Sequence, residues 1–193
     1  WSRGLGDVYK RLNYQPRDEM WSLTERPGNL RLKAFRPLVT DNLLKAGNTL
    51  TQRCFRTNKN EVIVKMNIKG MVDGQKAGLC HYSKSYAMVG VRQSGKDRNL
   101  EFHTNKEKIT GPAIKGNKVW IKSVWGLDGK SQFSYSTDGR KFTPFGEAYQ
   151  LEWGYYRGSR IGIYCFNNIV DAGYIDVDEF ISVSYTHLRA HET

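Results

Sequence analysis

Flat aromatic side chains next to polar ones are the residues of this sequence best suited to chemistry. Residues 119–122 read Val-Trp-Ile-Lys, and in a strand Trp120 and Lys122 would share one face while the two aliphatic side chains take the other. Saccharides have apolar C–H faces and hydroxyl-rich edges, so a sugar site combines an open ring with a few polar groups. Trp120 is therefore the first candidate for such a contact, and burial in the core is the alternative.

Five further aromatic residues are candidates for the same contact. Trp153, Tyr155 and Tyr156 fall in a segment that reads as a loop, where exposed rings suit binding. Trp125 precedes a predicted turn, and Tyr86 lies on a predicted strand. For each of the five, packing in the core is the alternative.

Known catalytic arrangements are missing from the sequence. It contains no GxSxG, HExxH, phosphate-binding glycine loop or dinucleotide fingerprint. His81 and His103 have no nucleophile in a recognisable context, so we expect both to be surface or strand residues. A glycosidase needs two carboxylates held across a sugar, and no such pair can be identified. We therefore predict no catalytic residue in this chain.

The densest acidic cluster is the segment 176–179, Asp-Val-Asp-Glu. Alternation would put Asp176 and Asp178 on one face about 7 Å apart, so spacing alone permits a carboxylate pair. A solvent-facing strand or a hydrogen-bonding role at a strand end is the simpler interpretation. A bound calcium is the third, although one strand supplies only part of its oxygen shell. We expect no other metal or cofactor.

Short alternating segments separated by turn residues must position these side chains. This period-2 pattern is typical of half-buried antiparallel strands, and long helical periodicity is absent. Glycines in Pro27-Gly28, Asp73-Gly74, Asp128-Gly129 and Asp138-Gly139 mark turns, and the last predicts a hairpin. Without crossover helices, the chain is predicted to be an all-β, two-sheet antiparallel sandwich. The predicted strands are 19–24, 29–34, 49–55, 61–68, 77–82, 86–92, 100–104, 118–124, 131–136, 160–166 and 174–181.

Length and composition favour one globular domain. The 193 residues suit a single sandwich, which we place at residues 1–181. Residues 182–193 lose the alternation and resemble a translated adaptor from assembled environmental reads, so we expect a non-native or disordered tail. The start at Trp1 looks cut from a longer chain. No apolar run approaches the roughly 20 residues of a membrane helix, so no membrane partner is expected.

Charge and cysteine content limit the classes of partner and the kinds of site that the sequence allows. The formal net charge of +11 would attract polyanions, but the basic residues are mostly scattered singly, which argues against a nucleic-acid groove. Three widely spaced cysteines form no disulfide framework or CxxC site, so buried free thiols are expected. The cysteine pattern is compatible with a cytoplasmic, periplasmic or secreted location.

Two stretches resemble a known family. Residues 20–32 read Met-Trp-Ser-Leu-Thr-Glu-Arg-Pro-Gly-Asn-Leu-Arg-Leu, and residues 48–53 read Asn-Thr-Leu-Thr-Gln-Arg. Weaker matches follow in order at residues 71–79, 89–91, 133–139, 156–164 and 173–178. Together they resemble the concanavalin A-like β-sandwich at the carboxyl end of bacterial β-xylosidases and α-L-arabinofuranosidases of glycoside hydrolase family 43, also classed as carbohydrate-binding module family 91.

The resemblance implies recognition of xylan or xylo-oligosaccharides by a non-catalytic module. It also implies a partner, the five-bladed catalytic propeller of the parent enzyme, against which such a sandwich packs and whose active-site rim it can shape. That structural role is the alternative function. An independent glycosidase of the same fold is a third hypothesis, and the sequence offers no carboxylate set for it. No ligand-contacting residue can be carried over from the family, so the six aromatic candidates depend on the residue patterns alone.

Overall fold

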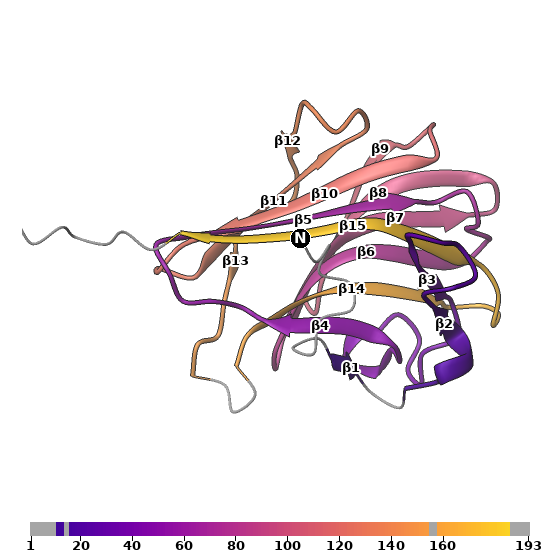
Figure 1. Cartoon of the computed structure of the whole chain (residues 1–193), viewed down its shortest axis with the longest axis horizontal. Helices are drawn as coiled ribbons and strands as arrows, with labels where there is room; N and C mark the ends of the chain where they lie inside the picture. Colours follow the sequence, from indigo (N-terminus) through magenta and orange to yellow (C-terminus); the bar gives the residue numbers. More distant parts are fainter. Residues whose placement is uncertain (1–10, 14–15, 155–157, 186–193) are drawn as a thin grey trace, which may run out of the picture.

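Antiparallel strands in two facing sheets make up the chain in a computed structural model, which describes residues 11–13, 16–154 and 158–185. Figure 1 shows the two layers, with β5, β10 and β15 above β14 and β4. Sheet A has the order β1 (Arg11–Asn13), β4 (Thr49–Arg53), β14 (Arg160–Asn167), β6 (Gln75–Tyr82), β7 (Tyr86–Ser94), β8 (Asp97–Thr104) and β9 (Lys108–Ala113).

Sheet B faces it. Its order is β12 (Thr143–Pro144), β11 (Lys130–Ser136), β10 (Lys118–Trp125), β5 (Lys59–Asn67), β15 (Tyr174–Tyr185), β3 (Leu30–Lys33) and β2 (Trp21–Ser22), and β13 (Tyr149–Gln150) also pairs with β11. The only helical elements among the described residues are the 3-10 turns η1 (Asp18–Met20) and η2 (Leu43–Lys45). No helix in this part of the chain has the length and hydropathy needed to cross a membrane. The predicted two-sheet antiparallel sandwich is confirmed.

Each predicted strand overlaps an observed one, but the predicted strand 19–24 is reduced to β2, because Asp18–Met20 forms the 3-10 turn η1. The short strands β1, β12 and β13 were not predicted. Strand β9 was not predicted, because it contains Gly111 and Pro112 and is a mostly exposed edge strand paired with β8 alone. Strand β15 continues past the predicted end at Ile181, with Tyr185 still opposite Lys59 of β5. Residues 186–193 of the predicted tail lie outside the described residues.

The core lies between the sheets and follows the alternation. Along β5, Val62, Val64 and Met66 are fully buried, while the residues between them are half-buried on the other face. One continuous cluster joins them to the inward side chains of β6, β7, β10 and β14. Because a single core serves both sheets, the strands hold one another in register.

The central strands of sheet A are buried on both faces, which the alternating pattern alone does not predict. The segment 36–48, with η2, supplies Leu43 and Ala46 to a second apolar cluster that contains Met88 and Tyr164. Such a cover removes the outer face of β6, β7 and β14 from solvent. The outer face of sheet B has no comparable cover among the described residues, and its strands β5 and β10 keep the pattern of buried and half-buried positions.

Candidate functional site

The outer face of sheet B carries the best-placed candidate ring. Strand β10 alternates as predicted: Val119 and Ile121 are fully buried, whereas Trp120 and Lys122 are half-buried on the outer face. In the strand register Trp120 stands between Lys65 of β5 and Ser136 of β11. The pleat therefore puts a flat ring on an open sheet face between polar neighbours.

The Asp138-Gly139 turn supports the Trp120 ring. Gly139 has φ +75°, and a Cβ built there would lie 2.8 Å from Cε2 of Trp120, so glycine permits both the turn and the close approach. Backbone N–H groups of Arg140 and Lys141 donate to the Asp138 carboxylate and lower its pKa to about 2. The predicted hairpin is confirmed, because Ser134 and Tyr135 of β11 pair with Pro144 and Thr143 of β12. The Asp138-Gly139 turn therefore forms one edge of the site.

A shallow depression adjoins the ring on the side of β5 and β15. Its volume is about 90 Å³, too small to enclose a sugar ring, so a ligand would lie over it rather than inside it. The Lys65 ammonium lies 5.6 Å from the centroid of the Trp120 ring and Lys65 also lines the depression, so the ring and the depression are neighbours. The polar residues that line it are Arg26, Asn29, Lys65, Asn67, Lys118 and Asp178.

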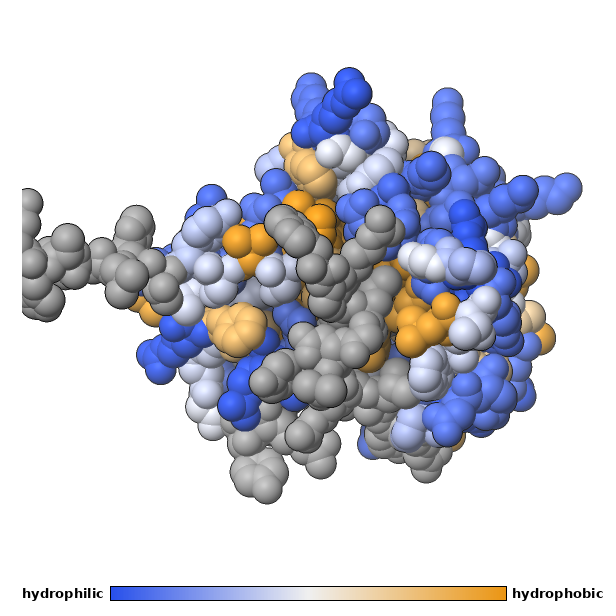
Figure 2. All heavy atoms as spheres, viewed as in Figure 1, coloured by the Kyte–Doolittle hydropathy of each residue, from blue (hydrophilic) through white to orange (hydrophobic). Residues whose placement is uncertain are grey.

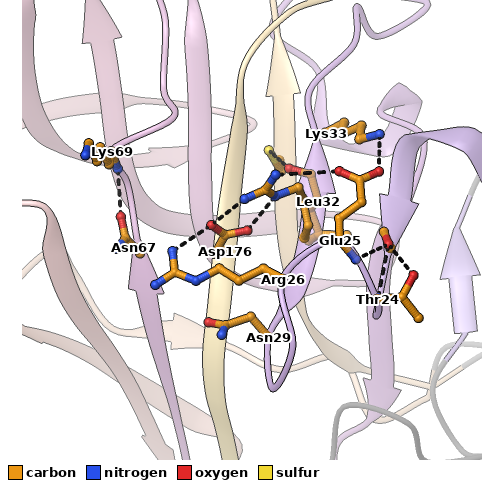
Figure 3. Close-up of polar contacts among 12 residues, drawn as sticks. Thr24, Glu25, Arg26, Asn29, Leu32, Lys33, Asn67, Lys69 and Asp176 are labelled. Carbon is orange, nitrogen blue, oxygen red and sulfur yellow. Dashed lines mark hydrogen bonds and ion pairs between the residues drawn. The ribbon is translucent and has the colours of Figure 1, made fainter.

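Asp176 holds the loop that forms one wall of the depression. Its side chain is only 3% exposed and accepts two hydrogen bonds from Arg31, at 2.8 Å from Nε and 3.0 Å from Nη2. Arg26, from the 26–29 loop, adds a third at 3.0 Å, as Figure 3 shows. The hydrogen bond to Asp176 raises the pKa of Arg31. Asp176 therefore serves as an anchor beneath the site.

The predicted acidic face exists, but it offers no free carboxylate pair. A bulge interrupts β15 between Val177 and Glu179. On either side of Val177, Asp176 is bonded to arginines and Asp178 pairs with Lys65 at 2.5 Å. The described residues contain no group of three His, Cys, Asp or Glu side chains placed to hold a metal ion. The interpretation that agrees with the geometry is a hydrogen-bonded structural role.

The other aromatic candidates do not join Trp120. Trp125 is 3% exposed, and its indole N–H donates to the carbonyl of Phe55 at 2.9 Å. Tyr86 is 5% exposed on the outer face of sheet A, beneath the 36–48 segment. Trp153 is half-buried against the core, and Tyr155 and Tyr156 lie outside the described residues. The burial of Trp125 and Tyr86 does not favour direct ligand contact, so the proposal below is built on Trp120.

A second polar cluster lies on sheet A, where its own ion pairs occupy it. The Lys76 ammonium lies 2.6 Å from Asp41 and 2.5 Å from Glu101, and Lys108 also pairs with Asp41. Burial raises the pKa of Asp41, but the hydrogen bonds from Lys108 and Lys76 outweigh it and hold that pKa well below its usual range. These contacts fasten the 36–48 segment to the sheet.

His81 and His103 lie in strands, as predicted, and both are buried. His81 is fully enclosed in the core, with Nε2 2.8 Å from Oγ of Ser123 and 2.7 Å from Oγ of Ser131. The distances suit a Ser–His pair, yet no substrate can reach a fully buried hydroxyl. His103 is buried beside Asp41, and burial lowers its pKa.

The expected buried free thiols are confirmed. Cys54, Cys80 and Cys165 are all buried and unpaired with one another. Burial raises the pKa of all three, that of Cys165 to about 12, which keeps them as unreactive thiols.

Sequence reasoning missed most of the residues around Trp120. Alternation alone could have identified Lys118, since it lies two positions before Trp120 on the same strand. Arg26, Asn29, Lys65 and Asn67 come from other elements, and only strand pairing brings them to the ring.

Comparison with known proteins agrees with the fold. Solved structures with the same arrangement include a bifunctional GH43-CE protein of Bacteroides eggerthii, which has a TM-score of 0.84 at 24% identity over 94% of this chain and 24% of that one. The GH43 protein BlXynB of Bacillus licheniformis gives a TM-score of 0.77 at 21% identity over 93% of this chain and 37% of its own. The chain therefore has the two-sheet sandwich fold of a domain found within these two larger proteins.

The family follows from the sequence match. Residues 9–182 match the family described as the β-xylosidase C-terminal concanavalin A-like domain, and this chain belongs to that family. A β-xylosidase of Formosa agariphila is 33% identical over 188 aligned residues, which cover 87% of this chain and 32% of that protein. The chain thus spans about a third of the curated relative. It corresponds to a domain of such glycoside hydrolases, separate from their catalytic domain, as the sequence resemblance implied.

Proposed function

We propose that this chain is a non-catalytic carbohydrate-binding module that recognises xylan or xylo-oligosaccharides for a parent β-xylosidase or α-L-arabinofuranosidase. The observation that carries the proposal is the half-buried Trp120 ring on the uncovered face of sheet B, next to a depression lined by charged and amide side chains. A ring of this kind can stack on the apolar face of a pyranose while nearby donors and acceptors meet its hydroxyl groups.

Replacing Trp120 with alanine tests this proposal. We expect the affinity for xylohexaose, measured by isothermal titration calorimetry, to fall at least about tenfold, because the ring is the main apolar contact of the site. Tyr185→Ala is the matched control, since Tyr185 is an exposed ring on the same sheet with Lys59 5.8 Å from its centroid. Equal affinities for the wild type and Trp120→Ala, or no binding by the wild type, would contradict the proposal.

A second function, docking against the catalytic propeller of the parent enzyme, has an observation of its own. Leu38 and Val39 are 61% and 49% exposed, and Ile169 and Val170 are 60% and 46% exposed. The two loops are neighbours, because the backbone N–H of Asp41 donates to the Asn168 side chain at 2.8 Å. On the face that Figure 2 shows, hydrophobic residues form small groups among hydrophilic ones. Exposed aliphatic groups of this kind are typical of surfaces that pack against another domain.

Docking can be measured with a relative's catalytic part. We expect this chain to bind the Formosa agariphila β-xylosidase from which the C-terminal domain has been deleted, and Leu38→Asp with Ile169→Asp to weaken that complex at least about tenfold, because a charge would then be buried in an apolar contact. Sedimentation velocity gives the affinities, and Leu127→Asp, at a 51% exposed leucine elsewhere, is the control. Unchanged binding by the double variant would exclude these loops as the contact.

A further inference from the structure

The depression beside Trp120 is lined by three cations, Arg26, Lys65 and Lys118, and by one carboxylate, Asp178. Asp178 pairs with Lys65 at 2.5 Å, and Asp176 already accepts two hydrogen bonds from Arg31. Arg26 is a second cation on Asp176 and uses one of its five N–H donors there. Lys118 is exposed and forms no ion pair within the described part of the chain.

The charges are also separated in space. Carboxylates gather on β15, where Asp176, Asp178 and Glu179 lie close to the cations of β3 and β5. On β10, Trp120 is flanked at two-residue spacing by Lys118 and Lys122, which share its face of the sheet. The anion on this side is Asp138, whose carboxylate accepts hydrogen bonds from the backbone N–H groups of Arg140 and Lys141 and forms no ion pair among the described residues. The two lysines beside Trp120 are therefore not neutralised by it, in a chain whose formal net charge is +11.

Arg26 and Lys118 both have N–H donors available to a ligand at the depression. The two residues come from different elements and line the same depression, and Asn29 and Asn67 line it as well, as neutral donors and acceptors. Figure 3 shows Arg26 and Asn29 side by side on their loop, across from Asn67 of β5. An ammonium and a guanidinium at the edge of an aromatic platform match a carboxylate carried on a sugar.

We propose that the site prefers acidic saccharides, in which a uronic acid branch lies over the depression while the neutral backbone stacks on Trp120. This inference rests on the proposed sugar-binding function and adds the substrate class. The carboxylate would be held by Arg26 and Lys118, and hydroxyl groups of the branch would meet Asn29 and Asn67. Because these cations are partly exposed, the preference is sensitive to salt.

Two ligands that differ in a single functional group test the inference. One is a xylo-oligosaccharide with one glucuronic acid branch, and the other is the same compound after its carboxyl group has been reduced to the alcohol. Calorimetry with the whole chain is expected to give about five- to tenfold tighter binding of the acidic compound at about 50 mM salt, since two partly exposed charge contacts are involved. At about 500 mM salt the ratio should approach one.

A charge variant identifies the residues responsible. In Lys118→Gln the ratio of the two affinities should fall to about twofold or less, as expected after loss of one of two charge contacts. The ratio is taken within one variant, so any change in folding or stacking affects both ligands alike. Lys96→Gln, with the same charge change in the β7–β8 turn of sheet A, should keep the wild-type ratio.

The outcomes separate the two claims. Equal affinity for the acidic and reduced compounds would overturn the acidic preference and leave sugar binding intact. An acidic preference that Lys118→Gln retains in full would refute the assignment to this depression. Failure of both compounds to bind would remove the proposed function, and this inference with it.

Discussion

Lowering the pH from 7 to 4.5 is expected to reduce the free energy of unfolding of this domain by about 3 kcal/mol through His81 alone. Burial lowers the pKa of His81 to about 3. In the unfolded chain the ordinary pKa is about 6.5, so between these values the unfolded state binds the extra proton. The stabilisation is therefore complete above about pH 6.5 and decreases as the pH falls toward 3.

Urea unfolding at several pH values measures this loss. Carboxylates whose pKa is lowered in the folded state, such as Asp41, begin to lose their contribution below about pH 5, so the loss between pH 7 and about 5 comes mainly from the histidines. His103, whose pKa burial also lowers, contributes in the same direction, and a His103→Asn variant should keep the larger part of the loss. In His81→Asn the loss should largely disappear.

NMR spectroscopy measures the pKa of His81 directly in the folded wild type, so it does not depend on how well a variant folds. The imidazole of His81 in the folded wild type should stay neutral at pH 4.5, because charging it would leave a cation in an apolar core beside Trp125 and Phe133. An NMR titration of the ring showing an ordinary pKa near 6.5 would contradict this account.

Replacing Asp176 with alanine is expected to cost about 3 kcal/mol of stability. The carboxylate is 3% exposed, so its removal leaves the Arg31 guanidinium, itself only 20% exposed, without its main partner. Arg26 is 44% exposed and can form hydrogen bonds with water instead, so the expected loss of stability lies at the low end of the range for buried pairs. Thermal and urea unfolding would measure the loss.

A nearby carboxylate supplies the comparison. Asp178→Ala removes an anion whose side chain is 32% exposed, and we expect a loss of about 1 kcal/mol or less. Asp176→Ala should also free the 26–29 loop, so its affinity for xylohexaose should fall if the loop forms part of the site. An Asp176→Ala protein as stable as the wild type would show that the arginines find other partners.

The direction of side chains along the central strands and the positions of the turns could be predicted from the sequence. The alternation along β5 and β10 correctly placed Val119 and Ile121 inside and Trp120 outside, because a strand's side chains must point to opposite faces. Gly74, Gly129 and Gly139 all have positive φ, as their turn pairs predicted. These features depend on each residue's own geometry and on near neighbours.

The burial of Tyr86 could not be derived in the same way. The alternation places Tyr86 on the outer face of sheet A, but the cover over that face comes from Leu43 and Ala46, about forty residues earlier in the chain. Trp125, by contrast, has the same inward phase as Val119 and Ile121 on β10, and its ring contacts His81 across the core. A strand pattern indicates which face a side chain takes and says nothing about what covers that face.

The sequence by itself determined the longer central strands, the turns and the family of this domain, since those depend on side-chain period, backbone freedom and matching motifs. Only the tertiary structure decided that Lys65, Lys118 and Arg26 would meet beside Trp120, and that Asp176 would sit beneath them bonded to arginine. The reason is that such a site is assembled across β3, β5, β10 and β15. Pairing between strands distant in the chain is fixed by the closing of the common core rather than by any local preference.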